Sequence, residues 1–459
     1  MFWLIHRAEV QSITIDEANS FRVFAQAGHY SIWQPLSNNH VLNSILMRLL
    51  NWLFGISQFT ARGPALFGGF VYIAASYSLC VSLTGQWMLR APLFIGFIYN
   101  PFVMDYLVVA RGYGLALGFF TLAIALAVRT LLRLDEAGDW ELIWVTAGIS
   151  ACLGISFCAN YSFAFANAAL LCVFYARVSL RVAGWRGRLR LAFAATAPAV
   201  VLTMCIAGPM LLRFPRKELY WGTNSLIETW QYIYSASFNQ TPRSYYLLTL
   251  GALILVAYTL SLVRDRSRSC VSSRVGVAAI AACVLGLSLL MHWFQFKLFA
   301  VPLPLDRTSL WVMPLLMTFV GSLLSAPPAS SVQRMIRGLG LIVLGLCGIL
   351  FIASLRDSYF QEWRLYGADV KSAFPVLIEL SRKMGVREIP ADWKDVPSLN
   401  FYRDLYGVTD LPPFQQYDKI PSGRKLYALP RKEYQEFIHT EGLHAVYQGP
   451  ISNLEILVK

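Results

Sequence analysis

The chain has 459 residues, of which 56% are apolar and only 14% are charged, and its formal net charge is +13. Soluble domains carry about 25% charged residues, so a single aqueous core cannot bury this much apolar surface. A membrane is therefore the expected solvent. The arginines gather in short stretches between apolar runs, as in cytoplasmic loops, and no nucleic-acid-binding signature accompanies them. We expect an integral membrane protein that does not bind nucleic acid.

The first 61 residues contain no apolar run long enough to span a membrane. The stretch "ITIDEANS" places Asp16 and Glu17 side by side. Segment 39–55, "NHVLNSILMRLLNWLFG", is apolar but carries Arg48 and several asparagines, so we expect a helix lying in the membrane interface. A chain whose residue 16 lies outside normally needs a preceding helix. Either a first span lies upstream of residue 1, or segment 39–55 crosses the membrane.

Ten apolar segments follow, each of about the 17–25 residues that a tilted transmembrane helix needs. They are 62–83, 91–110, 113–131, 141–158, 160–176, 191–212, 245–263, 275–292, 308–325 and 338–355. The arginine-rich links after the fifth and seventh segments are placed inside by the positive-inside rule. Alternation then places residues 1–61, the links near 105–112, 213–244 and 293–307, and everything after 356 on the outer side.

Residues 356–459 mix polar and apolar residues and form no further span. The stretch "SAFPVLIELSRKMG" predicts a helix ended by a glycine, and "RKLYALP" and "LHAVYQ" predict short strands. The expected fold is an all-α polytopic membrane bundle of 10–11 helices with interfacial helices in the first outer loop. Its domains are a first outer loop (1–61), a transmembrane domain (62–355) and a small soluble extracytoplasmic α/β domain (356–459).

Several features favour structural roles. The eight cysteines lie mostly in apolar segments and form no CxxC pair, which indicates buried thiols. The "GYG" at 112–114 leads into a span and is expected to serve helix packing. Trp221 and Trp311 stand near segment ends, as in interfacial aromatic belts. No cofactor is predicted. No metal site is predicted either, since no DxD or His/Asp cluster occurs, although a divalent cation would help to neutralise a phosphate.

Ionisable side chains are almost missing from the predicted spans and collect on the outer side. Transporters coupled to ions or protons usually keep such residues at mid-membrane depth. The asymmetry therefore indicates a reaction centre at the outer membrane–water boundary. The polar residues gathered there are Asp16, Glu17, Asn38, Asn39, His40, Asp105, Arg111, Lys297, Asp306 and Arg307.

Four motifs occur in order on this outer side. They are "IDEANSF", "NNHVLNSILMRLLNWLFGISQFTARGPALFGG", "NPFVMDYLVVARGYGLAL" and "PLPLDRTSLWVMPLL". With them the chain resembles the GT-C glycosyltransferases, multi-span enzymes that take a sugar from a polyprenyl-phosphate carrier. The nearer resemblance is to the protein O-mannosyltransferases and the lipid A aminoarabinose transferases. One departure is Asn38-Asn39-His40, which stands where those relatives show His-Pro-Pro and indicates a separate bacterial branch.

The resemblance implies that Asp16 and Glu17 are catalytic. Asp16 would act as the general base on an acceptor hydroxyl in a single inverting displacement. Glu17 would orient the acceptor or a neighbouring basic residue. The alternative is that the two carboxylates form an acidic surface loop.

The leaving lipid phosphate needs cations, and an arginine fork binds phosphate bidentately. Arg111, Arg307 and Lys297 are the candidates, although Arg307 is also placed to anchor in the lipid headgroups. The remaining expected substrate-binding residues are Asn39, His40, Asp105, Tyr113 and Asp306. Asp105 either binds substrate or pairs with Arg111. His40 assists proton transfer, binds a metal with Asp16 or caps the interfacial helix.

We therefore expect a glycosyltransferase of the bacterial inner membrane whose active site faces the periplasm. Its donor would be a polyprenyl-phosphate sugar, and its acceptor a glycan, a lipid or a protein. Membrane lipids are its other partners. Two alternatives are a transporter or flippase for a lipid-linked sugar, and a non-enzymatic envelope protein that binds a partner.

Overall fold

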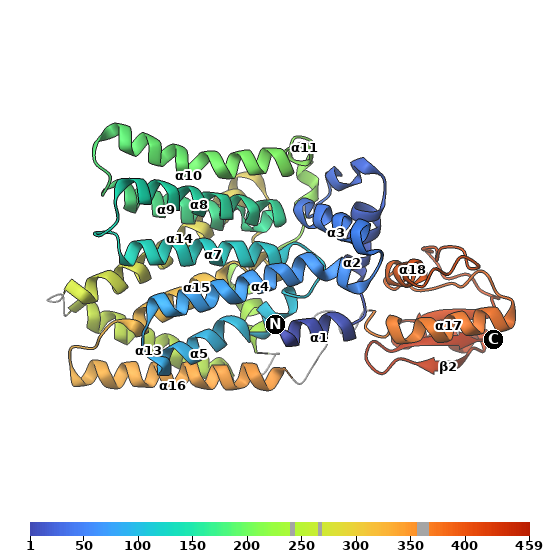
Figure 1. Cartoon of the computed structure of the whole chain (residues 1–459). Helices are drawn as coiled ribbons and strands as arrows, with labels where there is room; N and C mark the ends of the chain where they lie inside the picture. Colours follow the sequence, from blue (N-terminus) through green and yellow to red (C-terminus); the bar gives the residue numbers. More distant parts are fainter. Residues whose placement is uncertain (239–243, 265–268, 356–366) are drawn as a thin grey trace.

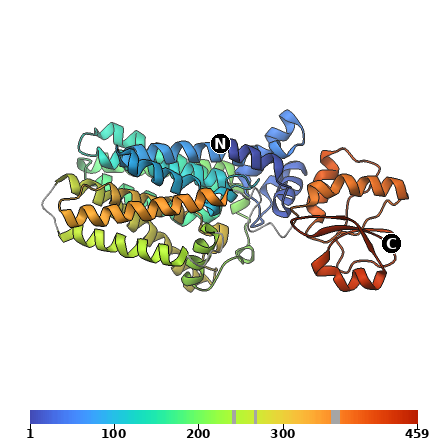
Figure 2. The ribbon, with the colours of Figure 1, turned by 90° about the horizontal axis from the view of Figure 1, so that it is seen from below.

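The computed structural model describes residues 1–238, 244–264, 269–355 and 367–459. A long bundle of roughly parallel helices forms the larger part, and the C-terminal domain sits beyond one end of it (Figures 1 and 2). The residues left out include part of the second arginine-rich link and the predicted start of the C-terminal domain at 356. That domain boundary remains a prediction.

Eight described helices are long and apolar enough to cross a membrane. They are α4 (Gln58–Leu83), α7 (Tyr113–Leu132), α8 (Asp139–Ala159), α9 (Ala164–Ser179, extended by η3, Tyr161–Phe163), α10 (Gly184–Ile206), α13 (Ser244–Arg264), α14 (Ser269–Phe299) and α16 (Ser331–Ser354). Two shorter apolar helices run beside them, α5 (Trp87–Ile98) and α15 (Val312–Ser325) (Figure 1). Each of the ten predicted segments therefore overlaps one of these helices, and the predicted all-α membrane bundle is confirmed.

The second predicted span, 91–110, is not one continuous helix. α5 ends at Ile98, and a separate short helix, α6 (Pro101–Tyr106), follows. Proline disfavours helical backbone at the residue before it, and Asn100 is accordingly extended. The Asn100 side chain accepts the Phe102 backbone N–H at 3.0 Å and so caps α6. The break leaves an irregular link before α7 that can carry site residues.

Glycines let the helices around this link approach closely. A Cβ at Gly68 of α4 would collide with the backbone of Gly114 in α7, and one at Gly112 would collide with the carbonyl of Ala159. Small residues at such contacts are a common means of packing membrane helices. The predicted packing role of the "GYG" stretch is confirmed, and the contact fixes the start of α7 against α4 and α8.

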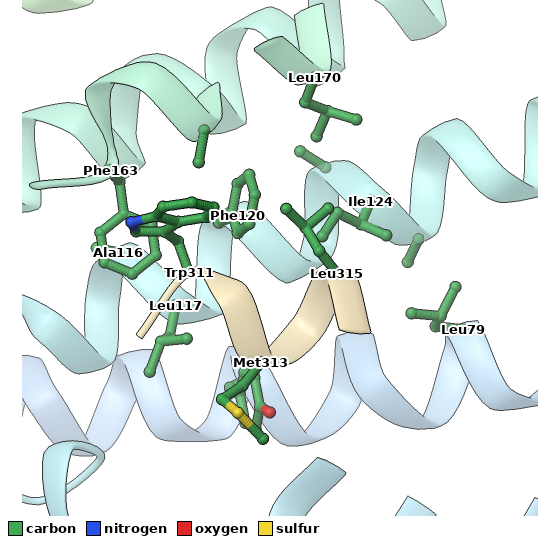
Figure 3. Close-up of a cluster of buried hydrophobic side chains, with 14 of the residues drawn as sticks. Leu79, Ala116, Leu117, Phe120, Ile124, Phe163, Leu170, Trp311, Met313 and Leu315 are labelled. Carbon is green, nitrogen blue, oxygen red and sulfur yellow. The ribbon is translucent and has the colours of Figure 1, made fainter. Parts of the chain in front are cut away.

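The bundle core is apolar and contains Trp311. Figure 3 shows this side chain among Phe120, Phe163 and Leu315, contributed by α7, η3 and α15. Trp311 has no solvent exposure, and its ring stacks on that of His292 with centroids 5.6 Å apart. The predicted place of Trp311 in an interfacial belt is therefore wrong. Trp311 comes two residues after the short helix η5 (Asp306–Ser309), and its ring buries more area in the bundle core than it would at the membrane interface.

Short elements cover the end of the bundle that faces the C-terminal domain (Figure 1). They are α1 (Phe2–Val10), α2 (Ile15–Asn19), the π-helix η1 (Ser20–Gln26), η2 (His29–Trp33), α3 (Val41–Phe54), α11 (Gly208–Leu211), η4 (Arg216–Glu218), α12 (Leu226–Ser237) and η5 (Asp306–Ser309). α3 is too short to cross a membrane. It buries Val41 and Met47 and exposes Trp52, Leu53 and Phe54, as expected for the predicted interfacial helix.

The C-terminal domain packs helices against a small sheet. Its elements are α17 (Val370–Met384), α18 (Val396–Leu405), β1 (Leu426–Pro430), α19 (Arg431–Glu441), β2 (His444–Gln448) and β3 (Leu454–Val458). The predicted helix ends at Gly385, which adopts a left-handed conformation. Both predicted strands are present, and β3, which was not predicted, lies between them in antiparallel pairing with Val458 opposite both Leu426 and His444.

Candidate active site

The candidate active site lies at the end of the bundle nearest the C-terminal domain. Three parts of the chain meet there, namely α2, the link between α6 and α7, and η5. α2 begins at Ile15 because Thr14 and Glu17 form a capping box. The Thr14 hydroxyl accepts the Glu17 backbone N–H at 3.3 Å, and the Glu17 carboxylate accepts the Thr14 backbone N–H at 2.8 Å. The cap fixes the directions in which the two adjacent carboxylates leave the helix.

Asp16 lies between two arginines that are distant in sequence. Its Oδ2 accepts a hydrogen bond from Nη1 of Arg111 and lies 3.2 Å from Nη1 of Arg307. The Asp16 side chain is 15% exposed. Both contacts are to the same carboxylate oxygen, Oδ2. The predicted grouping of Asp16 with Arg111 and Arg307 is therefore present in the fold.

Glu17 is fully buried and binds different partners. Its two oxygens accept hydrogen bonds from Nε and Nη2 of Arg62, both at 2.8 Å, and Oε1 also accepts the Ala110 backbone N–H at 2.7 Å. Arg62 in turn donates to the backbone carbonyls of the chain before α2. Of the two orienting roles that the sequence left open, this geometry fits orientation of a basic residue.

Arg111 is held by a loop that precedes α3. Its Nη2 donates to Asn38 Oδ1 at 3.0 Å, and its Nε donates to His40 Nε2 at 3.3 Å. The Tyr113 ring meets the His40 ring edge-on with centroids 5.3 Å apart. The side chain of His40, the last residue before α3, does not cap that helix. These contacts fix the orientation of the guanidinium, whose remaining nitrogen, Nη1, donates to Asp16.

His40 is neutral in the folded protein. Burial disfavours its imidazolium form, and the nearby Arg111 and Arg307 charges add to this, so its pKa lies well below the ordinary value of 6.5. The neutral ring accepts the Arg111 N–H through Nε2.

This burial predicts a pH-dependent stability. Below about pH 6.5 the unfolded chain protonates His40 whereas the folded chain does not, so acid favours unfolding. Wild type should lose up to about 2 kcal/mol more stability between pH 7 and pH 5 than His40→Gln does. Thermal unfolding of both proteins in detergent at the two pH values measures the difference. Equal losses would show that His40 protonates in the folded protein.

Two predicted substrate-binding residues lie away from the site. Asn39 is fully buried and donates to the carbonyls of Ile32 and Gln34, both at 2.9 Å, so it fixes the loop shape. Its sequence neighbour Asn38 contacts Arg111 instead. Lys297 is exposed near the end of α14, with its ammonium beside the ring of Phe296. The structure does not bring Asn39 or Lys297 to Asp16.

The two other predicted aspartates hold the frame of the site. Asp105 pairs with Arg7 at 2.6 Å, not with Arg111, so the alternative pairing considered from the sequence is wrong. The α6 helix points Asp105 toward α1, whereas Arg111 lies beyond the helix end. Asp306 is buried with a φ of 54°, and its Oδ1 accepts the Tyr106 hydroxyl at 2.8 Å. This strained turn directs the next residue, Arg307, toward Asp16.

A cavity of about 340 Å³ opens beside the two arginines. Arg111, Arg307, His40, Asn38 and Tyr113 form its polar wall. The other lining residues include Asn160, Tyr161, Glu218, Trp221, His292 and Gln295, which were not predicted as substrate-binding residues. The cavity thus combines two cations with apolar and hydrogen-bonding surface, which suits a phosphate joined to a sugar.

Sequence reasoning gave Trp221 an interfacial role, yet the residue also lines the cavity. The Arg307 guanidinium lies over its ring, 5.3 Å from the centroid. Such a cation–π contact restrains the arginine. No spacing signal in the sequence links residue 221 to residue 307, because their proximity depends on the path of the long link after α10. Within the described residues, no group of three or more His, Cys, Asp or Glu could hold a metal ion.

Neither a family model nor a curated protein matches the chain in sequence. Its fold matches two crystal structures of ArnT from Cupriavidus metallidurans, a GT-C transferase. The apo state gives a TM-score of 0.58 at 12% identity, with 99% of this chain and 95% of that chain covered. The structure bound to undecaprenyl phosphate gives 0.53 at 12% identity, with 99% and 96% covered. The chain is an integral membrane protein that shares the fold of ArnT, in line with the resemblance that its motifs indicated.

Proposed function

We propose that the chain is a membrane glycosyltransferase that moves a sugar from a polyprenyl-phosphate donor to an acceptor hydroxyl. The observation that carries this proposal is Asp16 held between Arg111 and Arg307 beside a cavity at the end of the bundle nearest the C-terminal domain. A structural neighbour with the same fold binds undecaprenyl phosphate, which supports a polyprenyl-phosphate partner. The active site would face the periplasm of a bacterial inner membrane.

The chemistry requires one base and one stabilised leaving group. The acceptor oxygen attacks the anomeric carbon, and its proton passes to Asp16. The bond from the anomeric carbon to the phosphate oxygen breaks, and its electron pair leaves with the lipid phosphate. A single displacement of this kind inverts the anomeric centre. Because both arginines contact Oδ2, Oδ1 is the oxygen that we assign to the acceptor proton.

The two arginines would bind the phosphate from the cavity side. Guanidinium groups form short, charge-assisted hydrogen bonds to phosphate oxygens. A bound phosphate competes with Asp16 for these donors, so donor binding loosens the ion pairs that occupy the carboxylate. The base would thus become available when the donor is in place, and the arginines would then stabilise the charge that develops on the leaving phosphate.

Arg307→Ala should weaken the binding of polyprenyl phosphate about 10-fold or more, because each charge-assisted hydrogen bond is worth about 1.5–3 kcal/mol. Titration of the purified protein in detergent with undecaprenyl phosphate measures the dissociation constant. Arg181→Ala is the matched control, since Arg181 is half-exposed and pairs weakly with Asp135 in the link after α7. An unchanged affinity in Arg307→Ala would remove Arg307 from the phosphate site.

The acceptor could be a glycan, a lipid or a protein hydroxyl. The direct test gives purified protein a panel of radiolabelled polyprenyl-phosphate sugars together with a membrane extract as acceptor. Transfer supports the proposal and identifies the donor. Movement of an intact donor across liposomes without transfer would favour the flippase. Binding without either reaction would favour an envelope binding protein.

A further inference from the structure

The C-terminal domain touches the chain directly before the catalytic carboxylate. Figure 1 shows α18 facing α2. The hydroxyl of Tyr402 in α18 accepts the Ile13 backbone N–H at 2.9 Å and the side-chain N–H of Gln58 at 3.0 Å. It also donates to the Ser12 hydroxyl at 3.4 Å. Ile13 stands only three residues before Asp16, so this contact fixes the backbone from which α2 starts.

The Tyr402 hydroxyl has no spare hydrogen-bonding capacity. A phenol offers one donor and two acceptor positions, and the three contacts use all of them. The side chain is fully buried, and its ring packs against those of Phe374, Phe401 and Tyr406. The hydroxyl is therefore placed by a rigid aromatic cluster of the C-terminal domain.

A second residue of α18 holds the other side of the same peptide. The Ser398 hydroxyl donates to the Ile13 carbonyl at 3.0 Å, so both backbone groups of Ile13 bind α18. The Phe21 ring meets the Phe401 ring edge-on with centroids 5.3 Å apart. The first outer loop and the C-terminal domain thus share one hydrophobic core, which buries Ile13 completely.

We propose that the C-terminal domain positions the catalytic carboxylate, with Tyr402 as the principal positioning residue. The inference rests on the proposed transferase function and assigns a role to a domain outside the bundle. Tyr402 does not line the cavity, whereas Arg111 and Arg307 do. It acts on the direction of Asp16 through Ile13 and the capping box at Thr14, and the two cavity-lining arginines hold the donor independently of it.

Tyr402→Phe tests the inference because it keeps the ring and removes only the hydroxyl. The turnover number should fall about 10- to 50-fold, and KM for the donor should change less than about twofold, because a base 1 Å out of place can cost 100-fold. Hydrogen exchange at the amides of residues 12–17, Ile13 above all, should become faster. Tyr406→Phe is the matched control, since Tyr406 joins the same aromatic cluster but is half exposed. Ser398→Ala should give a smaller loss of the same kind.

The results separate the possible roles. Faster exchange confined to residues 12–17 together with a fall in turnover alone would support positioning. Exchange and turnover equal to those of Tyr406→Phe would overturn it. A general loss of stability with parallel changes in turnover and KM would also overturn it, since that pattern marks a purely structural tyrosine. If wild type transfers no sugar, the proposed function fails, while the local exchange difference still decides whether α18 orders the Asp16 loop.

Discussion

Asp16→Asn is expected to lower sugar transfer at least about 100-fold, since general base catalysis typically contributes that much or more. The amide keeps the size of the side chain but cannot take the acceptor proton. The binding of undecaprenyl phosphate should stay near the wild-type value or tighten slightly, because Arg111 and Arg307 lose their competing carboxylate. Single-turnover transfer and lipid titration on the same preparation measure both quantities.

The control for this substitution is Asp135→Asn. Asp135 is 97% exposed in the link after α7, so the change removes one charge without touching the candidate site. Because Asp16→Asn also removes the carboxylate that pairs with Arg111 and Arg307, its unfolding temperature is measured alongside, and transfer is compared only on folded protein. Transfer within threefold of wild type in folded Asp16→Asn would exclude Asp16 as the base.

The sequence predicted the parts of this protein that depend on local pattern. Apolar length found the spans, and the break at Pro101 was the main departure, because proline acts on the residue before it. The resemblance motifs selected Asp16, Arg111 and Arg307, which the fold brings together across three distant segments. The uneven distribution of ionisable residues predicted that these three residues lie on the same side of the membrane, but it did not predict which of them are in contact.

Contacts across the fold were the part that the sequence could not supply. Arg62 stands in the quoted "TARGP" stretch, yet nothing in its spacing predicts a buried pair with Glu17, 45 residues away. Likewise, Asn39 and Asn38 are chemically identical neighbours, and only the turn before α3 decides which one meets Arg111. Asp105 pairs with Arg7, although its place in the sequence also allowed a pair with Arg111. Such choices depend on packing between segments, which no local pattern records.

The two adjacent carboxylates lie in different environments, and we expect them to have different roles. Asp16 is partly accessible beside the cavity, whereas Glu17 is fully buried and binds Arg62 and the backbone N–H groups of Thr14 and Ala110. Asp16 is the residue that we propose for the reaction, while Glu17 holds the start of α2 against α4 and the link before α7. Substitution of Asp16 should therefore mainly lower sugar transfer, and substitution of Glu17 should mainly lower stability.

Glu17→Gln is expected to destabilise the protein by about 3–5 kcal/mol, because it leaves the fully buried Arg62 charge without its carboxylate. The glutamine amide has one acceptor oxygen where the carboxylate has two. Either the Thr14 or the Ala110 backbone N–H would therefore lose its acceptor. Chemical unfolding of detergent-solubilised wild type and variant measures the difference in free energy. Asp135→Asn is the matched control and should unfold like wild type, because Asp135 is almost fully exposed.

The double substitution Glu17→Gln with Arg62→Gln separates lost pairing from lost packing. If the main cost is the stranded charge, the double variant should be less destabilised than the sum of the two single variants, by about 1–3 kcal/mol. Additive losses would mean that Glu17 and Arg62 act independently, and stability equal to wild type in Glu17→Gln would refute the structural role. Any Glu17→Gln protein that remains folded should bind undecaprenyl phosphate, because Glu17 does not line the cavity and the two cavity arginines are unchanged.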